Sequence, residues 1–141
     1  MAASHEIRLK VPFHHLDPMR IVWHGNYMKY FDMARCGLFE AAGIDLYRWS
    51  TEEGYVFPIT RTEVKHVAPL GPSDEFVCRA TVTEAGYKIA MRFEIRRWPG
   101  GQICARAHSE QVAVKLPDMD LALEIPAPIR RALEGGSDGP G

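Results

Sequence analysis

A strongly apolar helix flanked by long strand patterns is the feature that most limits how this chain can fold. Residues 27–42 carry apolar side chains at helical spacing, with Asn26 placed to cap the start and Gly43 the end. Only a narrow polar strip is left on this helix, formed by Lys29, Asp32, Cys36 and Glu40. Because a helix this apolar is normally covered by other elements, we expect it to be enclosed by a sheet.

Strand patterns stand on both sides of the predicted helix. Residues 5–13 alternate, with Ile7, Leu9, Val11 and Phe13 on one face. Further strands are predicted at 56–67, 75–84, 87–98 and 102–115, and a short helix at 129–134. Strands this long favour a twisted or curved sheet. The order of strand, helix and four strands predicts the α+β class, with the helix against one sheet face.

The chain length of 141 residues fits one domain, so a single core has to hold the site. No linker divides residues 1–134, and the glycine-rich end, residues 135–141, is predicted to be a flexible tail. A net charge of -1 with interspersed signs argues against nucleic acid as a partner. Without a signal peptide or a membrane-spanning run, we expect a soluble, cytoplasmic protein with no membrane partner.

Neither the cysteines nor the histidines are spaced as metal ligands. Cys36, Cys78 and Cys104 are far apart and form no CxxC motif, which favours reduced thiols. His14 and His15 are adjacent on a chain expected to be extended, so their side chains point to opposite sides. We therefore expect no metal ion.

The connection between the first strand and the helix, FHHLDPMRIVWHGNY, carries the residues suited to chemistry. Asp17 lies upstream of the helix start at His24, Gly25 and Asn26, where exposed backbone N–H groups and the helix dipole stabilise a developing anion. A carboxylate beside such a helix end is a minimal acyl-transfer site. Asp before Pro is also a common turn, in which the carboxylate only binds neighbouring N–H groups.

This stretch resembles the hotdog-fold acyl-CoA thioesterases of the 4-hydroxybenzoyl-CoA thioesterase type. The resemblance covers roughly residues 5–115, and the matching positions are Phe13, Asp17-Pro18, Ile21-Val22-Trp23 and Asn26-Tyr27, followed by MKYFDMAR. It implies a hotdog fold, in which a curved antiparallel sheet of about five strands wraps around one long central helix. It also implies hydrolysis of a thioester to a carboxylic acid and free coenzyme A. Coenzyme A is then part of the substrate, and no cofactor is expected.

The resemblance assigns roles to residues of the connection. Asp17 is expected to act as nucleophile or general base, and His24 occupies the helix-start position whose N–H polarises the carbonyl. Gly25 and Asn26 are expected to support the oxyanion, and Trp23 and Tyr27 to contact the substrate. The family usually has a small residue and Gly after the Asp-Pro pair, whereas this chain has Met19-Arg20.

Several alternatives stay open at this point. A hotdog-type hydratase or dehydratase and a non-catalytic acyl-CoA-binding module would use the same scaffold, and Glu63 is a second candidate carboxylate. The carrier can be coenzyme A or acyl carrier protein. The cations that could meet its phosphates are Arg61, Lys65, Lys88, Arg92, Arg96 and Arg97. A single-layer sheet with one helix leaves edges uncovered, so we expect a homodimer or homotetramer whose sites are completed by a neighbouring subunit.

Overall fold

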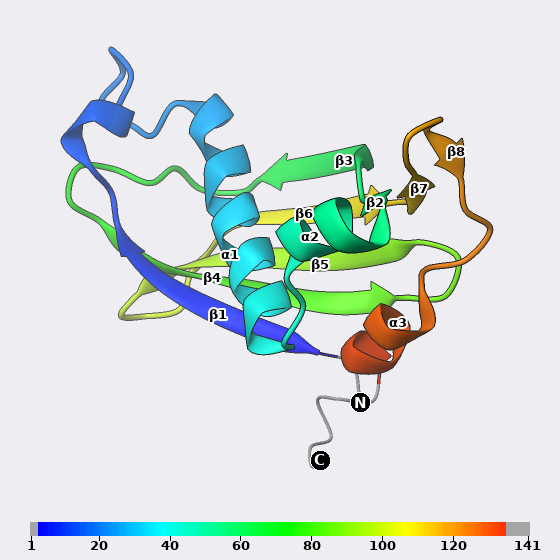
Figure 1. The fold of residues 1–141 in the computed structure, drawn as a ribbon. Helices are drawn as coiled ribbons and strands as arrows, with labels where there is room; N and C mark the ends of the chain where they lie inside the picture. Colours follow the sequence, from blue (N-terminus) through cyan, green and yellow to red (C-terminus); the bar gives the residue numbers. More distant parts are fainter. Residues whose placement is uncertain (1–2, 135–141) are drawn as a thin grey trace.

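A five-stranded antiparallel sheet with one long helix across a face forms the centre of the computed structural model, which describes residues 3–134 (Figure 1). Along the sheet the strands follow the order β1-β4-β5-β6-β3. Their bounds are Ser4–Lys10 for β1, Ile59–His66 for β3, Glu75–Glu84 for β4, Ile89–Trp98 for β5 and Ile103–Gln111 for β6. The α+β class and the five-stranded antiparallel sheet are as predicted, and β1 and β3 are the two edges.

Strand register places apolar side chains on the sheet face under the helix. Cys78 of β4 pairs with Ile95 of β5, and Ala80 pairs with Phe93. All four side chains are fully buried. The alternation seen in the sequence therefore reflects one face turned to the core and one face turned outward.

The long helix α1 spans Tyr27–Ala41 and packs on the sheet through one face. Its Tyr30 ring lies 4.8 Å from Phe76, and its Phe31 ring lies 5.2 Å from Phe93. At Gly37 the helix comes so close to β1 that an added Cβ would lie 2.6 Å from the His5 ring. The opposite face of α1 is exposed, with Met33 at 48% exposure. The sheet of a single chain thus covers one side of the helix, rather than enclosing it.

The two ends of α1 differ in how well the sequence predicted them. At the C-terminal end Gly43 has φ +78°, and its N–H donates to the Glu40 carbonyl oxygen at 3.0 Å, as expected of a glycine that ends a helix. At the other end the prediction that Asn26 caps the helix was wrong. The Asn26 side chain makes no cap and instead donates from Nδ2 to the His15 carbonyl oxygen at 3.0 Å.

The prediction that Phe13 continues the apolar face of the first strand was also wrong. Strand β1 ends at Lys10, and Phe13 begins the short 3-10 helix η1, Phe13–His15, where its side chain is 89% exposed. Pro12 lacks an N–H group, so a strand cannot continue its hydrogen bonding through this position. Apolar and other residues still alternate in the sequence from Val11 to Phe13, although the pairing of β1 ends at Lys10.

Smaller elements close the ends of the sheet. The segment after α1 forms α2 (Leu46–Arg48) and the π-helical turn η3 (Trp49–Glu53), neither of which the sequence pattern predicted. A second, three-stranded sheet joins β2 (Tyr55–Val56), β7 (Val114–Lys115) and β8 (Asp120–Leu121). The predicted short helix is present as α3, Ala127–Glu134. The predicted tail, residues 135–141, lies outside the described residues.

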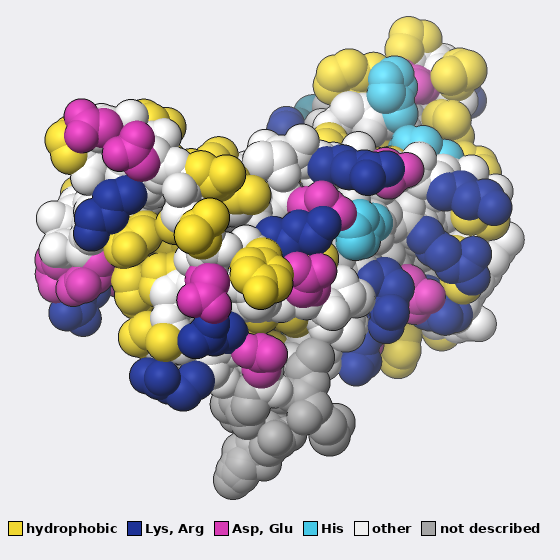
Figure 2. Space-filling view, turned by 90° about the vertical axis from the view of Figure 1, so that its right-hand side faces the viewer, with side chains coloured by type: hydrophobic (Ala, Val, Ile, Leu, Met, Phe, Trp, Pro, Cys, Tyr) yellow, Lys and Arg dark blue, Asp and Glu magenta, His cyan; other side chains and the backbone are white. Residues whose placement is uncertain are grey.

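The outer face of the sheet is rich in cations. Lys and Arg side chains project from all five strands and the turn before β5, namely Arg8, Lys10, Arg61, Lys65, Arg79, Lys88, Arg92, Arg96 and Arg106. Fewer acidic side chains stand among them, and several form ion pairs there, such as Arg8 with Glu75 at 3.0 Å. Figure 2 shows Lys and Arg gathered on one half of the surface and acidic and hydrophobic side chains more frequent on the other.

Candidate active site

Asp17 lies on a small hairpin between η1 and α1. The base of the hairpin is a bridge between Leu16 and Val22, above which the Asp17 N–H donates to the Ile21 carbonyl oxygen at 2.9 Å. One carboxylate oxygen, Oδ1, accepts from the Met19 N–H at 2.8 Å. The turn role that the sequence left open for Asp17 is therefore real. Since only Oδ1 makes this bond, it does not exclude a second role for the carboxylate.

Arg20 occupies the position at which the resembling family usually has glycine. Its φ is +63°, in the left-handed region, and its N–H donates to the Asp17 carbonyl oxygen at 2.9 Å. A side chain in this conformation costs about 1–2 kcal/mol relative to a right-handed one. The Met19-Arg20 departure therefore keeps the turn that glycine would favour, with a strained arginine at its corner.

The helix start follows directly after the hairpin. His24–Asn26 form the 3-10 turn η2, which runs into α1. The Trp23 indole lies over Gly25 so closely that an added Cβ would overlap it. The backbone N–H groups of this first turn are at the positive end of the helix dipole, where a carbonyl oxygen that gains negative charge is stabilised.

A cavity of about 400 Å³ joins the hairpin, the helix start and the end of β3. Its wall is formed by Asp17, Met19, Ile21, Val22, His24, Tyr27, His66, Val67, Ala68 and Pro69. It thus brings together three of the residues predicted from sequence, Asp17, His24 and Tyr27. Gly25, Asn26 and Trp23 do not line it: Asn26 is buried and bound to His15, and Trp23 and Gly25 pack on each other beside it.

His66 is a cavity residue that the sequence did not single out. It ends β3, and its ring meets the Tyr27 ring edge-on at a centroid distance of 4.7 Å. Tyr27 is 3% exposed, and burial raises the pKa of its hydroxyl. His66 follows the strand pattern of an ordinary sheet residue, and only the fold brings it to the helix start. Glu63, the second candidate carboxylate, lies on the outer face and pairs with Arg61 at 2.8 Å.

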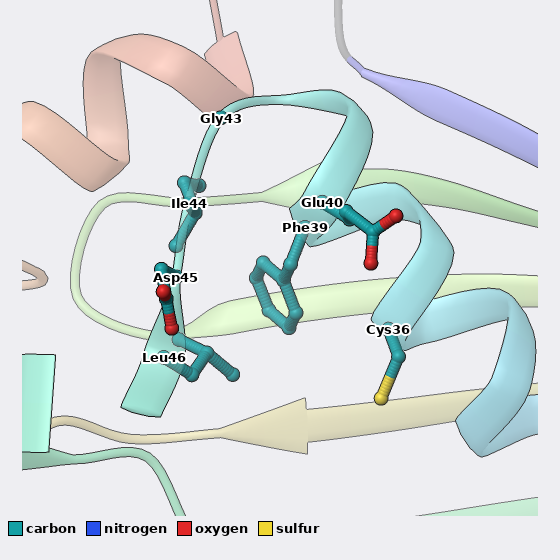
Figure 3. A pocket seen from close by; sticks show the side chains of 7 residues that line it. All are labelled: Cys36, Phe39, Glu40, Gly43, Ile44, Asp45 and Leu46. Atoms are coloured by element: carbon teal, nitrogen blue, oxygen red, sulfur yellow. The ribbon is translucent and has the colours of Figure 1, made fainter. Parts of the chain in front are cut away.

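A second cavity, of about 480 Å³, lies at the opposite end of α1 (Figure 3). It is lined by Cys36, Phe39, Glu40, Gly43, Ile44, Asp45 and Leu46. Helix carbonyl groups and two carboxylates give this end a negative character, which disfavours an oxyanion. None of the residues predicted for the site lies here.

Among residues 3–134, no group of three or more His, Cys, Asp or Glu side chains is arranged to hold a metal ion. No helix of the same range is long and apolar enough to span a membrane.

The fold and the arrangement of this site define a class of protein, the hotdog-fold thioester hydrolases. The sequence model of the Thioesterase-like superfamily matches residues 11–133, and the chain belongs to this superfamily. No curated protein matches the chain.

Solved structures of the same fold extend over nearly the whole chain. A 4-hydroxybenzoyl-CoA thioesterase from Pseudomonas sp. strain CBS-3 is 26% identical, with 93% of this chain and 99% of that chain covered at a TM-score of 0.82. A 1,4-dihydroxy-2-naphthoyl-CoA thioesterase from Synechocystis is 19% identical, with 92% and 95% covered at a TM-score of 0.85. A hypothetical protein from Thermus thermophilus is 25% identical, with 92% and 96% covered at a TM-score of 0.80.

Proposed function

We propose that this protein hydrolyses an acyl-CoA thioester to a carboxylic acid and free coenzyme A, with Asp17 as nucleophile or general base. The observation that carries the proposal is the cavity that is lined both by Asp17 and by His24 at the start of α1. An attacking group and an anion-stabilising helix end are the two components that acyl transfer requires. The thioesterases of similar structure support the same activity.

The proposed reaction follows from this geometry. Either the Asp17 carboxylate or a water molecule that it deprotonates attacks the thioester carbonyl carbon, and the carbonyl oxygen becomes negatively charged. The backbone N–H group of His24, which lines the cavity at the start of α1, stabilises this oxygen, whereas the Asn26 N–H already donates to the Trp23 carbonyl oxygen at 2.9 Å. The C–S bond then breaks, and coenzyme A leaves as the thiol after taking up one proton. In the nucleophilic variant, water hydrolyses the acyl-aspartate and regenerates the carboxylate.

The cavity wall favours an aromatic acyl group. Tyr27 and His66, whose rings meet edge-on, both line it, together with the apolar residues Ile21, Val22 and Val67. A volume of about 400 Å³ is sufficient for a small aromatic ring system and its carboxyl carbon. Two of the similar solved enzymes act on 4-hydroxybenzoyl-CoA and 1,4-dihydroxy-2-naphthoyl-CoA, which supports this class of substrate.

Lys65 is the cation that we propose for the phosphates of the coenzyme. It precedes His66 on β3, so it stands on the outer face next to the residue that lines the cavity. Among the described residues Arg61, Arg96 and Lys88 form ion pairs with Glu63, Glu94 and Glu110. Lys65 lies opposite Arg106 in the strand register; Arg106 pairs with Glu94 at 3.8 Å, whereas Lys65 makes no ion pair among the described residues, which favours Lys65 for an anionic group of the substrate.

We also propose that the chain forms a homodimer or homotetramer. Edge strand β3 is exposed along most of its length, and the face of α1 away from the sheet is uncovered in a single chain. A second copy placed along this edge would complete both the cavity beside His66 and the enclosure of the helix.

The test of the proposed function is thiol release from a panel of aromatic and aliphatic acyl-CoAs, with acyl carrier protein thioesters alongside. Asp17→Asn is expected to lower kcat by about 100-fold or more, since the attacking carboxylate is lost. Glu40→Gln, at the other end of α1, is the matched control and should keep full activity. Undiminished turnover by Asp17→Asn would remove Asp17 from the mechanism. Water addition to an enoyl-CoA, or tight binding of a non-hydrolysable analogue without turnover of any thioester, would indicate a hydratase or a binding module.

A further inference from the structure

Besides the N–H bond that His15 makes to the Pro12 carbonyl oxygen within η1, three hydrogen bonds join His15, at the base of the hairpin that carries Asp17, to Trp23, Asn26 and Tyr30. The His15 carbonyl oxygen accepts from the Trp23 N–H at 2.9 Å and from Asn26 Nδ2 at 3.0 Å. On the ring, Nδ1 lies 2.8 Å from the Tyr30 hydroxyl oxygen. Asn26 and Tyr30 are one helical turn apart at the start of α1. Asn26 binds the backbone of His15, and Tyr30 binds its ring.

The ring contact has one direction of donation. Tyr30 is 2% exposed, and burial raises the pKa of its hydroxyl to about 12, so it keeps its proton. Partial burial lowers the pKa of His15, and the nearby charges of His14 and Lys29 lower it further. Neutral His15 therefore accepts the Tyr30 proton at Nδ1 and carries its own proton on Nε2. Among the described residues, the Tyr30 hydroxyl has no other hydrogen-bond partner.

The hairpin has few other attachments to the fold. Beyond its own turn bonds, Val22 donates its N–H to the Leu70 carbonyl oxygen at 2.8 Å. Met19 at its tip is 72% exposed. Asp17 is two residues from His15 on the same strand of the hairpin, so a rotation about the base moves the carboxylate directly.

We propose that His15 is a positioning residue for Asp17, whose ring and carbonyl oxygen together clamp the hairpin onto the first turn of α1 through Tyr30 and Asn26. The inference rests on the proposed function, because the position it controls is that of the attacking carboxylate relative to the helix start. A displacement of about 1 Å at a reacting group can cost on the order of 100-fold in rate. The clamp therefore acts on kcat through the position of the carboxylate, while the cavity walls formed by the start of α1 and the end of β3 stay in place.

The variants divide the clamp into its parts. Tyr30→Phe and His15→Ala both remove the ring hydrogen bond, and each is expected to lower kcat by about 10- to 100-fold with KM changed by less than about threefold. His15→Asn places an amide oxygen near the position of Nδ1 and should restore kcat to within about threefold of the parent chain. Tyr47→Phe, at a tyrosine that is 76% exposed, is the control and should leave both constants unchanged.

The amide hydrogen exchange rate of Trp23 measures the stability of the clamp independently of catalysis. The Trp23 N–H, bound to His15, should exchange faster in Tyr30→Phe and in His15→Ala, and at the parent rate in His15→Asn. An unchanged Trp23 exchange rate in the first two variants would overturn the clamp, as would an unchanged kcat. A failure of His15→Asn to restore either readout would also overturn it. If the parent chain hydrolyses no thioester, the proposed function fails, and the exchange rates alone decide whether the clamp exists.

Discussion

Cavities of similar size lie at the two ends of α1, about 400 Å³ beside Asp17 and His24 and about 480 Å³ beside Glu40 and Asp45. At the first, the helix start at His24 and Asp17, which is carried on a separate hairpin, line the same cavity. At the second, the last carbonyl groups of the helix stand next to two further carboxylates. In the cavity of about 480 Å³, the carboxylates therefore add to the negative end of the helix dipole.

The direction of the helix, rather than the size of the cavity, supports placing the proposed site at the N-terminal end of α1. A thioester carbonyl oxygen that becomes negative is stabilised at one end of α1 and destabilised at the other. A substitution at one end of α1 therefore has its matched control at the other end.

The largest effect is expected from filling each cavity in turn. Ala68→Trp places an indole in the cavity beside Asp17, and steric exclusion of the acyl group should lower kcat/KM by about 100-fold. Leu46→Trp fills the other cavity and should change kcat/KM by less than about twofold. Steady-state kinetics with one aromatic acyl-CoA measures both. The opposite pattern would place the acyl group at the C-terminal end of α1.

Two glycines, one near each end of α1, should respond to alanine for different reasons. Gly25→Ala displaces the Trp23 indole from the helix start, and we expect kcat to fall by about 10-fold because water then reaches the N–H groups there. Gly43→Ala meets no neighbour but keeps φ near +78°, so it should reduce the free energy of unfolding by about 1 kcal/mol. Its kcat should be that of the parent. Kinetics together with urea unfolding separates the two, and a loss of kcat in Gly43→Ala would contradict the comparison.

The alkaline limb of stability should depend on Tyr30, near the N-terminal end of α1, and not on Tyr47 beyond its C-terminal end. The folded-state pKa of Tyr30 is about 12, above the value near 10 expected in the unfolded chain. Stability from this group is therefore fully present below about pH 10 and is lost as the pH rises towards 12, by about 1–3 kcal/mol. Tyr30→Phe should flatten that part of the profile, and Tyr47→Phe should not. Parallel profiles for the parent and Tyr30→Phe would be the contrary result. Unfolding in denaturant between pH 9 and 12 measures it.

The smallest effect is expected at Arg20. Arg20→Gly relieves the positive φ of +63°, and the gain is partly offset by the greater freedom of glycine in the unfolded chain. We expect a net stabilisation of about 0.5 kcal/mol, measured by thermal and urea unfolding. A destabilised variant would mean that the arginine side chain contributes more to the folded state than its backbone strain costs.

The parts of the fold that depend on local periodicity were predictable. Strand β4 has the predicted bounds, 75–84, because its alternation matches one buried and one exposed face. Helix α1 ends one residue before the predicted end, because Gly43 stops it. The strand order was not predictable, because no local sequence pattern indicates that β3 forms the edge of the sheet opposite β1.

The candidate site likewise combines residues that the local sequence predicted with residues that only the tertiary fold brings together. Asp17, His24 and Tyr27 were found because they lie within one short stretch of sequence that carries a known spacing. His66 comes from a strand about 40 residues further on, and the bond between His15 and Tyr30 joins side chains 15 residues apart. Asn26 is a residue type that often caps a helix. Here its side-chain amide instead donates to the carbonyl oxygen of His15, which only the tertiary fold brings near.

The uneven placement of charge described for the sheet has a consequence for how substrate arrives. A chain of net charge -1 whose outer sheet face is positive must carry an excess of negative charge elsewhere, so the molecule is an electric dipole. On the proposed function, a polyanionic substrate approaching in solution is repelled by one side and attracted to the other, and the positive side adjoins the cavity where Lys65 precedes the lining residue His66. Diffusional capture is then guided before any contact forms. Raising the ionic strength shortens the range of that guidance to a few ångströms without altering the site itself.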